Sequence, residues 1–180
     1  MQPQRRRNRV ILGVLALGLL AGGALTAPPA QAVDAVGPYY AVPSWDQILP
    51  AATRFVVLTN WNSQAVLDKE TGLVWERTPS LTLFFPGPAE EHCTNATTTG
   101  ARKGWRLPSV HELRSLNDPA VAAPGPTLPP GHPFTTGATG VQVAFYWTAT
   151  TNAEDPTLAW LMYFFNGDVG TNNKGVNTLL

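Results

Sequence analysis

Residues 104–113 read Gly-Trp-Arg-Leu-Pro-Ser-Val-His-Glu-Leu, and the elements around them can be placed from this stretch. Ser109 precedes a run with helical spacing, and Glu112 lies three residues after Ser109, which is the pattern of a helix capping box. Pro108 lies just outside such a helix. The apolar side chains that follow lie near one face: Val110, Leu113 and Leu116. The stretch therefore predicts a short helix from residue 110, ended by the Asn-Asp-Pro sequence at 117–119.

A second short helix is expected upstream. Pro86-Gly87-Pro88 closes a loop, and the residues that follow predict a helix over 89–97. The sequence thus predicts two short helices.

Strands are predicted on both sides of the helices. Apolar, β-branched or aromatic runs cover 54–58, 65–68, 73–77, 145–150 and 159–165. Residues 69–72 predict a turn with Gly72 at a position of positive φ, and Leu73 and Trp75 are expected to face one way on the strand that follows. Asn166-Gly167 predicts a two-residue type I′ hairpin leading into a return strand at 168–170.

The remaining segments are rich in proline and glycine. Residues 33–52 predict an irregular arm, and residues 119–141 predict a long irregular loop across the surface. Together with the strands and helices, these segments predict an α+β fold. It would have a small antiparallel sheet, two short helices and long loops, and residues 53–180 would form a single domain.

The N-terminus has the layout of a secretory signal peptide over residues 1–32. Four arginines within residues 5–9 precede an uncharged apolar run at 10–24, and Ala30-Gln31-Ala32 offers the small residues that signal peptidase requires. The apolar run has 15 residues, fewer than the roughly 20 of a membrane-spanning helix. We expect a secreted or cell-surface protein (periplasmic if an outer membrane retains it) without a stable membrane anchor after cleavage. An uncleaved anchor is the alternative.

Charge narrows the class of partner. The chain has 12 basic and 12 acidic residues, and four basic residues but no acidic ones fall within 1–32. Residues 33–180 therefore carry 8 basic and 12 acidic residues, and a mildly acidic domain is a poor general binder of nucleic acid. Their length suits one domain with its own core.

Five pieces of this sequence, in order and spacing, are similar to the Lcl C-terminal domain family, a bacterial family of unknown function named after the C-terminal domain of the Legionella collagen-like adhesin. The resemblance spans about residues 54–174. The residues that carry the signature are Asp68, Thr71, Gly72, Trp75, Trp105, Leu107, Pro108, Glu112, Leu113, Tyr146, Trp147, Asn166 and Gly167. Ala89, His92 and Cys93 resemble the family's helix that ends in an aromatic residue and a cysteine.

The resemblance implies a secreted or surface α+β domain, C-type lectin-like in style, that works in adhesion or ligand binding. Family members usually continue into a last strand with a second cysteine, whereas this chain ends at Leu180, so either the last strand is shortened or the chain is truncated. Cys93 is the single cysteine, and we expect it to be buried and inert; a free thiol or a bridge between chains is the alternative.

The candidate binding residues are Arg102, Lys103 and Arg106, the one local basic cluster, with Arg114 further along the chain. They would suit an acidic polysaccharide. The structural alternative for Arg106 is an ion pair with Glu112. The signature tryptophans are expected to fill the core rather than to stack on sugars.

No catalytic, metal-binding or cofactor site is predicted. The three histidines are scattered without zinc-ligand spacing, and neither a Gly-x-Ser-x-Gly elbow nor a phosphate-binding glycine loop is present. The primary hypothesis is a binding or adhesion module, not an enzyme, whose partner is an extracellular glycan or a surface protein. The alternatives are a structural or assembly domain, which could form an oligomer, and a hydrolase with an unfamiliar site.

Overall fold

A computed structural model describes residues 49–179. The predicted signal peptide and the arm up to residue 48 lie outside the described residues. The arm was expected to be irregular through residue 52, but its end is helical: α1 (Ala51–Arg54) is a single turn in which the carbonyl of Pro50 accepts from the backbone of Thr53 and Arg54. Pro50 suits this place because a helix start needs no N–H there.

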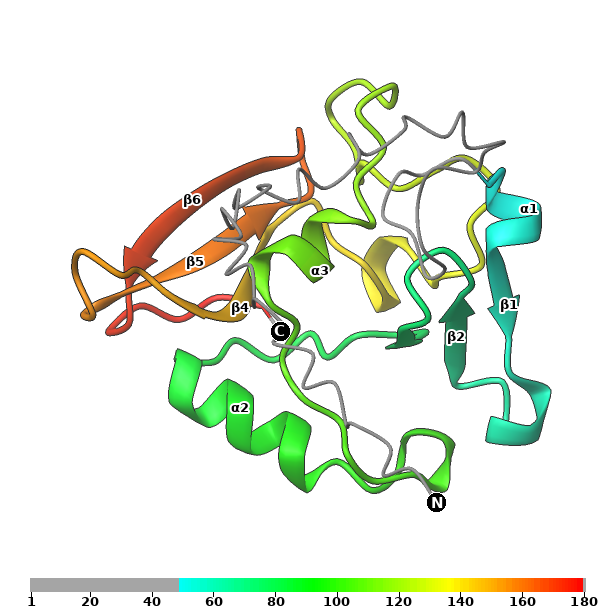
Figure 1. Cartoon of the computed structure of the whole chain (residues 1–180), viewed down its shortest axis with the longest axis horizontal. Helices are drawn as coiled ribbons and strands as arrows, with labels where there is room; N and C mark the ends of the chain where they lie inside the picture. The colour runs from blue at the N-terminus through cyan, green and yellow to red at the C-terminus, as the bar shows by residue number, and fades with distance from the viewer. Residues whose placement is uncertain (1–48, 180) are drawn as a thin grey trace, which may run out of the picture. The chain divides into compact units, whose positions relative to one another are not determined.

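The first sheet is a three-stranded antiparallel meander in chain order (Figure 1). Its strands are β1 (Phe55–Val57), β2 (Ala65–Asp68) and β3 (Val74–Glu76). The predicted turn at 69–72 is confirmed: Gly72 has φ 71°, and its N–H donates to the carbonyl of Asp68. β2 has the predicted bounds, whereas β1 and β3 are each one residue shorter at both ends than the predicted runs. The 3-10 helix η1 (Thr59–Trp61) joins β1 to β2.

The second sheet is also three-stranded, antiparallel and in chain order. Its strands are β4 (Phe145–Thr151), β5 (Leu158–Tyr163) and β6 (Asp168–Asn173). Near the end of the chain, Thr178 pairs with Phe84 and Leu179 pairs with Tyr146 beside β4. The prediction of one small sheet was therefore incomplete, because the described strands divide into two sheets within a mixed α+β fold.

The predicted two-residue turn at Asn166-Gly167 was wrong. The last β5–β6 pair is Tyr163 with Asp168, so residues 164–167 form a four-residue connection in which only Gly167 has positive φ. A type I′ turn needs positive φ at both central residues. Phe164 leaves the ladder because its backbone bonds to Ala144 and Thr127 and its side chain is buried in the core.

Both predicted helices are present. α2 (Pro86–Asn95) starts three residues earlier than expected, because proline at the first helical positions has a suitable φ and needs no N–H partner. α3 (Val110–Arg114) is shorter than expected and continues as a turn through Leu116. α3 packs against β4 and β5, which places its buried face on the second sheet.

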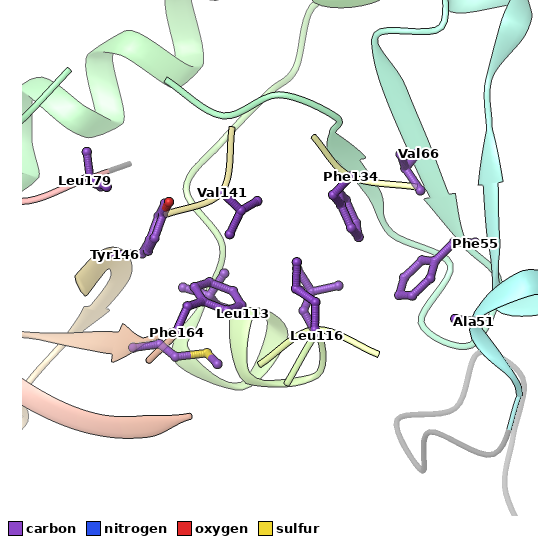
Figure 2. Close-up of a cluster of buried hydrophobic side chains, with 12 residues drawn as sticks. Ala51, Phe55, Val66, Leu113, Leu116, Phe134, Val141, Tyr146, Phe164 and Leu179 are labelled. Carbon is purple, nitrogen blue, oxygen red and sulfur yellow. The ribbon is translucent and has the colours of Figure 1, made fainter. Parts of the chain in front are cut away.

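The core joins both sheets and the long segment between them. Figure 2 shows Phe55 and Val66 of the first sheet on the side of Phe134, and Tyr146 and Phe164 on the other side. The expectation that residues 119–141 form a surface loop is correct in being irregular but wrong in part about location. Its buried members are Thr127, Leu128, Phe134, Gly140 and Val141.

Candidate functional site

The predicted binding residues lie on an extended segment that connects the 3-10 helix η2 (Thr99–Ala101) to α3. Arg102, Lys103 and Arg106 are all exposed. The guanidinium carbon of Arg102 lies 5.0 Å from the ring centre of Trp61, in a cation–π contact. Within the described residues, neither Arg102 nor Lys103 forms an ion pair.

The segment is held against Trp61 by a glycine. Gly100 has φ 62°, and a Cβ atom at this position would lie 2.9 Å from the Cβ of Trp61. The N–H of Gly100 also donates to the side chain of Gln64 at 2.8 Å. Trp61 in turn contacts Trp105 edge to face, with ring centres 6.2 Å apart. Two tryptophans and an arginine therefore meet at the start of the segment.

Arg106 forms the ion pair with Glu112 that the sequence offered as an alternative. Its two terminal nitrogens donate to the two carboxylate oxygens of Glu112 at 2.7 and 2.5 Å, and one nitrogen also reaches the carbonyl of Leu107. These hydrogen bonds are the main cause that lowers the pKa of Glu112 to about 2 and raises the pKa of Arg106. Arg106 thus has a structural partner, although its side chain remains 58% exposed.

The capping box is present as predicted. The Ser109 hydroxyl accepts from the backbone N–H of Glu112 at 3.2 Å, and the Glu112 carboxylate accepts from the backbone N–H of Ser109 at 2.7 Å. Glu112 therefore serves the helix start and Arg106 at the same time. The segment is also tied to β4, since Ala149 donates to the carbonyl of Pro108.

A cavity of about 350 Å³ lies beside the segment. Its outer lining includes the exposed residues Arg102, Lys103 and Gly104, and its inner lining includes buried core residues. The signature residues that line it are Trp75, Trp105, Leu107, Pro108, Glu112, Leu113, Tyr146 and Trp147. A space of this size, lined mainly by apolar side chains with a few charged groups, has the character of a small-molecule pocket.

The three signature tryptophans occupy different positions in this lining. Trp147 is fully buried, and its indole N–H donates to the carbonyl of Phe84 at 2.9 Å. Trp75 and Trp105 are half-buried. Trp147 therefore has the core position expected for all three, whereas Trp75 and Trp105 are only partly buried in the cavity wall.

The other signature residues lie away from the cavity. Asp68, Thr71 and Gly72 belong to the first sheet's hairpin, and Asn166 and Gly167 belong to the β5–β6 connection. The side chain of Thr71 accepts from the N–H of Leu73, which fixes the turn. The structure thus separates the signature into a cavity group and a turn group.

Sequence reasoning missed the buried ion cluster of Arg54, Asp68 and Glu70. Arg54 donates to both oxygens of Asp68, at 2.9 and 2.7 Å, and to the carbonyl of Ser115 at 2.8 Å. Glu70 lies 3.2 Å from the same guanidinium. The sequence pattern placed Arg54 at the start of a strand. The feature that could have indicated a buried ion pair is a long charged side chain beside an apolar run.

Cys93 lies on α2 and lines the cavity. It is half-buried rather than buried, so the expectation was too strong on this point. Burial, with smaller contributions from Glu76 and Glu90, raises the pKa of the thiol to about 11. The thiol is therefore protonated at neutral pH and is a poor nucleophile.

The remaining candidate groups do not assemble. Over residues 49–179, no three His, Cys, Asp or Glu side chains lie close enough together to hold a metal ion. His92 contacts the ring of Phe84, and burial lowers the pKa of His132, which lies beside Phe134. Nor does this part of the chain contain a helix long and apolar enough to cross a membrane.

Comparison with known proteins identifies a family. No curated protein matches the chain, and no solved structure matches it, so the expected likeness to C-type lectins stays a prediction. A model of the Lcl C-terminal domain matches residues 64–180, which is well over half of the chain. The match covers β2, β3, α2, α3 and the whole second sheet, so the chain belongs to the Lcl C-terminal domain family.

Proposed function

We propose that this protein is a secreted or cell-surface binding module whose segment 102–106 contacts an acidic polysaccharide. The observation that carries the proposal is the exposed pair Arg102 and Lys103, which have no ion-pair partner in the described structure and lie beside the ring of Trp61. Cations next to an aromatic face suit a sugar that carries carboxylate or sulfate groups.

The family and the N-terminal sequence support the proposed secreted or cell-surface location. The family is linked by name to a collagen-like adhesin, and residues 1–32 have the layout of an export signal. The proposal includes that the protein binds its partner without catalysing a reaction. A broad panel of hydrolase substrates tests this part. Turnover of a substrate by the unmodified protein, lost when a cavity residue is replaced, would contradict it.

The test of the main proposal is binding to a mixed glycan array at low and moderate salt. We expect salt-sensitive binding to sulfated or uronic glycans. Replacing both cations (R102A/K103A) should weaken it about 5- to 30-fold, since two exposed charge contacts contribute about 0.5–1 kcal/mol each.

A matched control removes two lysines that do not line the cavity, Lys69→Ala with Lys174→Ala. This variant has the same net charge as the double variant and should bind as the unmodified protein does. Equal weakening by both variants would show a general charge effect and contradict the assignment to segment 102–106. If the folded protein bound no glycan on the array, the proposal that it binds an acidic polysaccharide would be wrong.

A second candidate function is assembly with a second copy of the chain. An apolar surface lies near the start of β4, where Leu83, Val143 and Phe145 are exposed at 59%, 43% and 44% and line one shallow depression. Sedimentation analysis over a concentration series tests this. A dimer that dissociates in Phe145→Ser would support assembly, and a monomer at all concentrations would contradict it.

A further inference from the structure

Two buried indole N–H donors in residues 49–179 have no acceptor. The indole nitrogens of Trp75 and Trp105 are inaccessible to solvent and form no hydrogen bond within the described structure. A buried N–H without a partner destabilises a fold by about 1–3 kcal/mol, so most folds avoid it. The third signature tryptophan follows the usual rule, since Trp147 donates to Phe84.

Both unpaired donors belong to residues that line the cavity of about 350 Å³. Its inner lining is formed by the main core, including Leu113, Leu128 and Phe134. Protein interiors normally contain few voids larger than one water molecule. The core is therefore packed around a space of ligand size rather than filling it.

The charges on this lining favour an anion. The lining contains three cationic residues, Arg102, Lys103 and Arg106, and two carboxylates, Glu76 and Glu112. Both carboxylates already have partners: Glu76 accepts from the hydroxyl of Thr99 at 2.6 Å, and Glu112 is bound to Arg106. One positive charge is left over, and the two cations without ion-pair partners lie on the exposed side of the cavity.

We infer that the cavity binds a small organic anion with a flat apolar body. The apolar body packs against the tryptophan and core side chains, and the negative charge lies toward Arg102 and Lys103. Because the two indole nitrogens are closed to solvent in this structure, the rings of Trp75 and Trp105 turn on binding, so that their N–H groups reach acceptor oxygens of the ligand. This ligand class goes beyond the proposed polysaccharide contact, because such a molecule enters the interior of the domain.

A pair of matched probes tests the inference on the unmodified protein. 8-Anilinonaphthalene-1-sulfonate carries an apolar body and a sulfonate, and N-phenyl-1-naphthylamine has the same rings without the sulfonate. Fluorescence titration and calorimetry should give saturable one-to-one binding of the sulfonate, at least about tenfold tighter than the neutral amine. Equal affinity for the two probes would contradict the preference for an anion. If a cooperatively folded protein bound neither probe saturably, the cavity would not be a binding site.

Variants locate the site. Trp75→Phe and Trp105→Phe each remove one N–H donor, and each should weaken sulfonate binding about fivefold or more. Trp160→Phe is the control, because Trp160 lies on β5 and does not line the cavity. Binding that all three variants leave unchanged, or that Trp160→Phe weakens equally, would overturn the assignment.

The inference and the proposed function fail separately. Glycan binding with no binding of the sulfonate leaves the surface segment as the functional part and overturns the interior site. Binding of the sulfonate together with no binding to the glycan array would support the interior site and contradict the polysaccharide proposal. Loss of both activities in R102A/K103A, with only sulfonate binding weakened in the tryptophan variants, is the expected pattern.

Discussion

At the scale of single residues, Asp68 and Arg54 illustrate a charge pair inside the core. Both side chains are almost completely buried, at 0% and 1% exposure. Two parallel N–H···O bonds join them, and the backbone of Ser115 takes a further donor of Arg54. The pair thus connects the first sheet's hairpin to the residue that follows α3.

Asp68→Asn should lower the free energy of unfolding by about 3 kcal/mol or more, because it leaves a buried guanidinium short of its main counter-charge. Denaturant titration measures the change. Glu91→Gln, an exposed carboxylate on α2, is the control and should change it by less than about 0.5 kcal/mol. Equal effects of the two substitutions would show that the buried pair contributes no special stability.

Glu112 makes stability depend on pH. Its pKa falls from 4.5 to about 2 in the folded protein, first because of the hydrogen bonds from Arg106. A carboxyl group with a depressed pKa stabilises the fold fully above its unfolded value, and this contribution disappears as the pH falls from about 4.5 to about 2.

Glu112→Gln should therefore remove part of the decrease in melting temperature between pH 6 and pH 2. Melting curves at steps across that range measure it. Glu91→Gln should keep the decrease of the unmodified protein. A curve for Glu112→Gln parallel to that of the unmodified protein would contradict the role of the pair.

At the scale of elements, the β5–β6 connection differs from its prediction because a tertiary contact displaced a local preference. The Asn-Gly pair favours a tight turn. However, burying the Phe164 side chain ends β5 at Tyr163 and lengthens the connection to four residues. Gly167 still has the positive φ that the pattern predicts.

Gly167→Ala should destabilise the protein by about 1–3 kcal/mol. Its φ of 79° strains an alanine, and the added Cβ would lie 2.3 Å from the side-chain oxygen of Asn117. Gly170→Ala on β6 is the matched control, since no atom lies within 4 Å of its added Cβ and its φ is not positive. Thermal unfolding should shift for the first substitution and by much less for the second.

At the scale of the whole described domain, the irregular segment 119–141 completes the core. Leu128, Phe134 and Val141 pack with residues of both sheets, and Phe134 meets Phe55 edge to face at 5.3 Å. A segment without regular structure therefore contributes packing that two small three-stranded sheets could not supply alone. It also provides part of the cavity lining.

Phe134→Ala should lower the free energy of unfolding by about 3–5 kcal/mol, which is the usual effect of removing a buried phenylalanine. Phe85→Ala serves as the comparison because Phe85 is 42% exposed, and it should change stability by less than about 1 kcal/mol. If Phe134→Ala unfolded at the same denaturant concentration as the unmodified protein, segment 119–141 would not be part of the core.

The sequence by itself determined the local features and the family. The capping box at Ser109, the turn at Gly72, the ion pair of Arg106 with Glu112 and the mixed α+β class were all predicted and are present. The capping box, the turn and the ion pair each depend on residues a few positions apart, and the α+β class follows from the order of strand and helix patterns along the chain, so the side-chain pattern is enough to reveal them.

The tertiary structure alone decided the rest. It divided the strands into two sheets, joined Arg54 to Asp68 and placed Trp61, Trp75 and Trp105 around one cavity. These contacts join residues that lie far apart in the chain, and no local spacing encodes them. Which buried donors lack an acceptor depends on how the whole core packs, so only the folded domain could show the candidate ligand site.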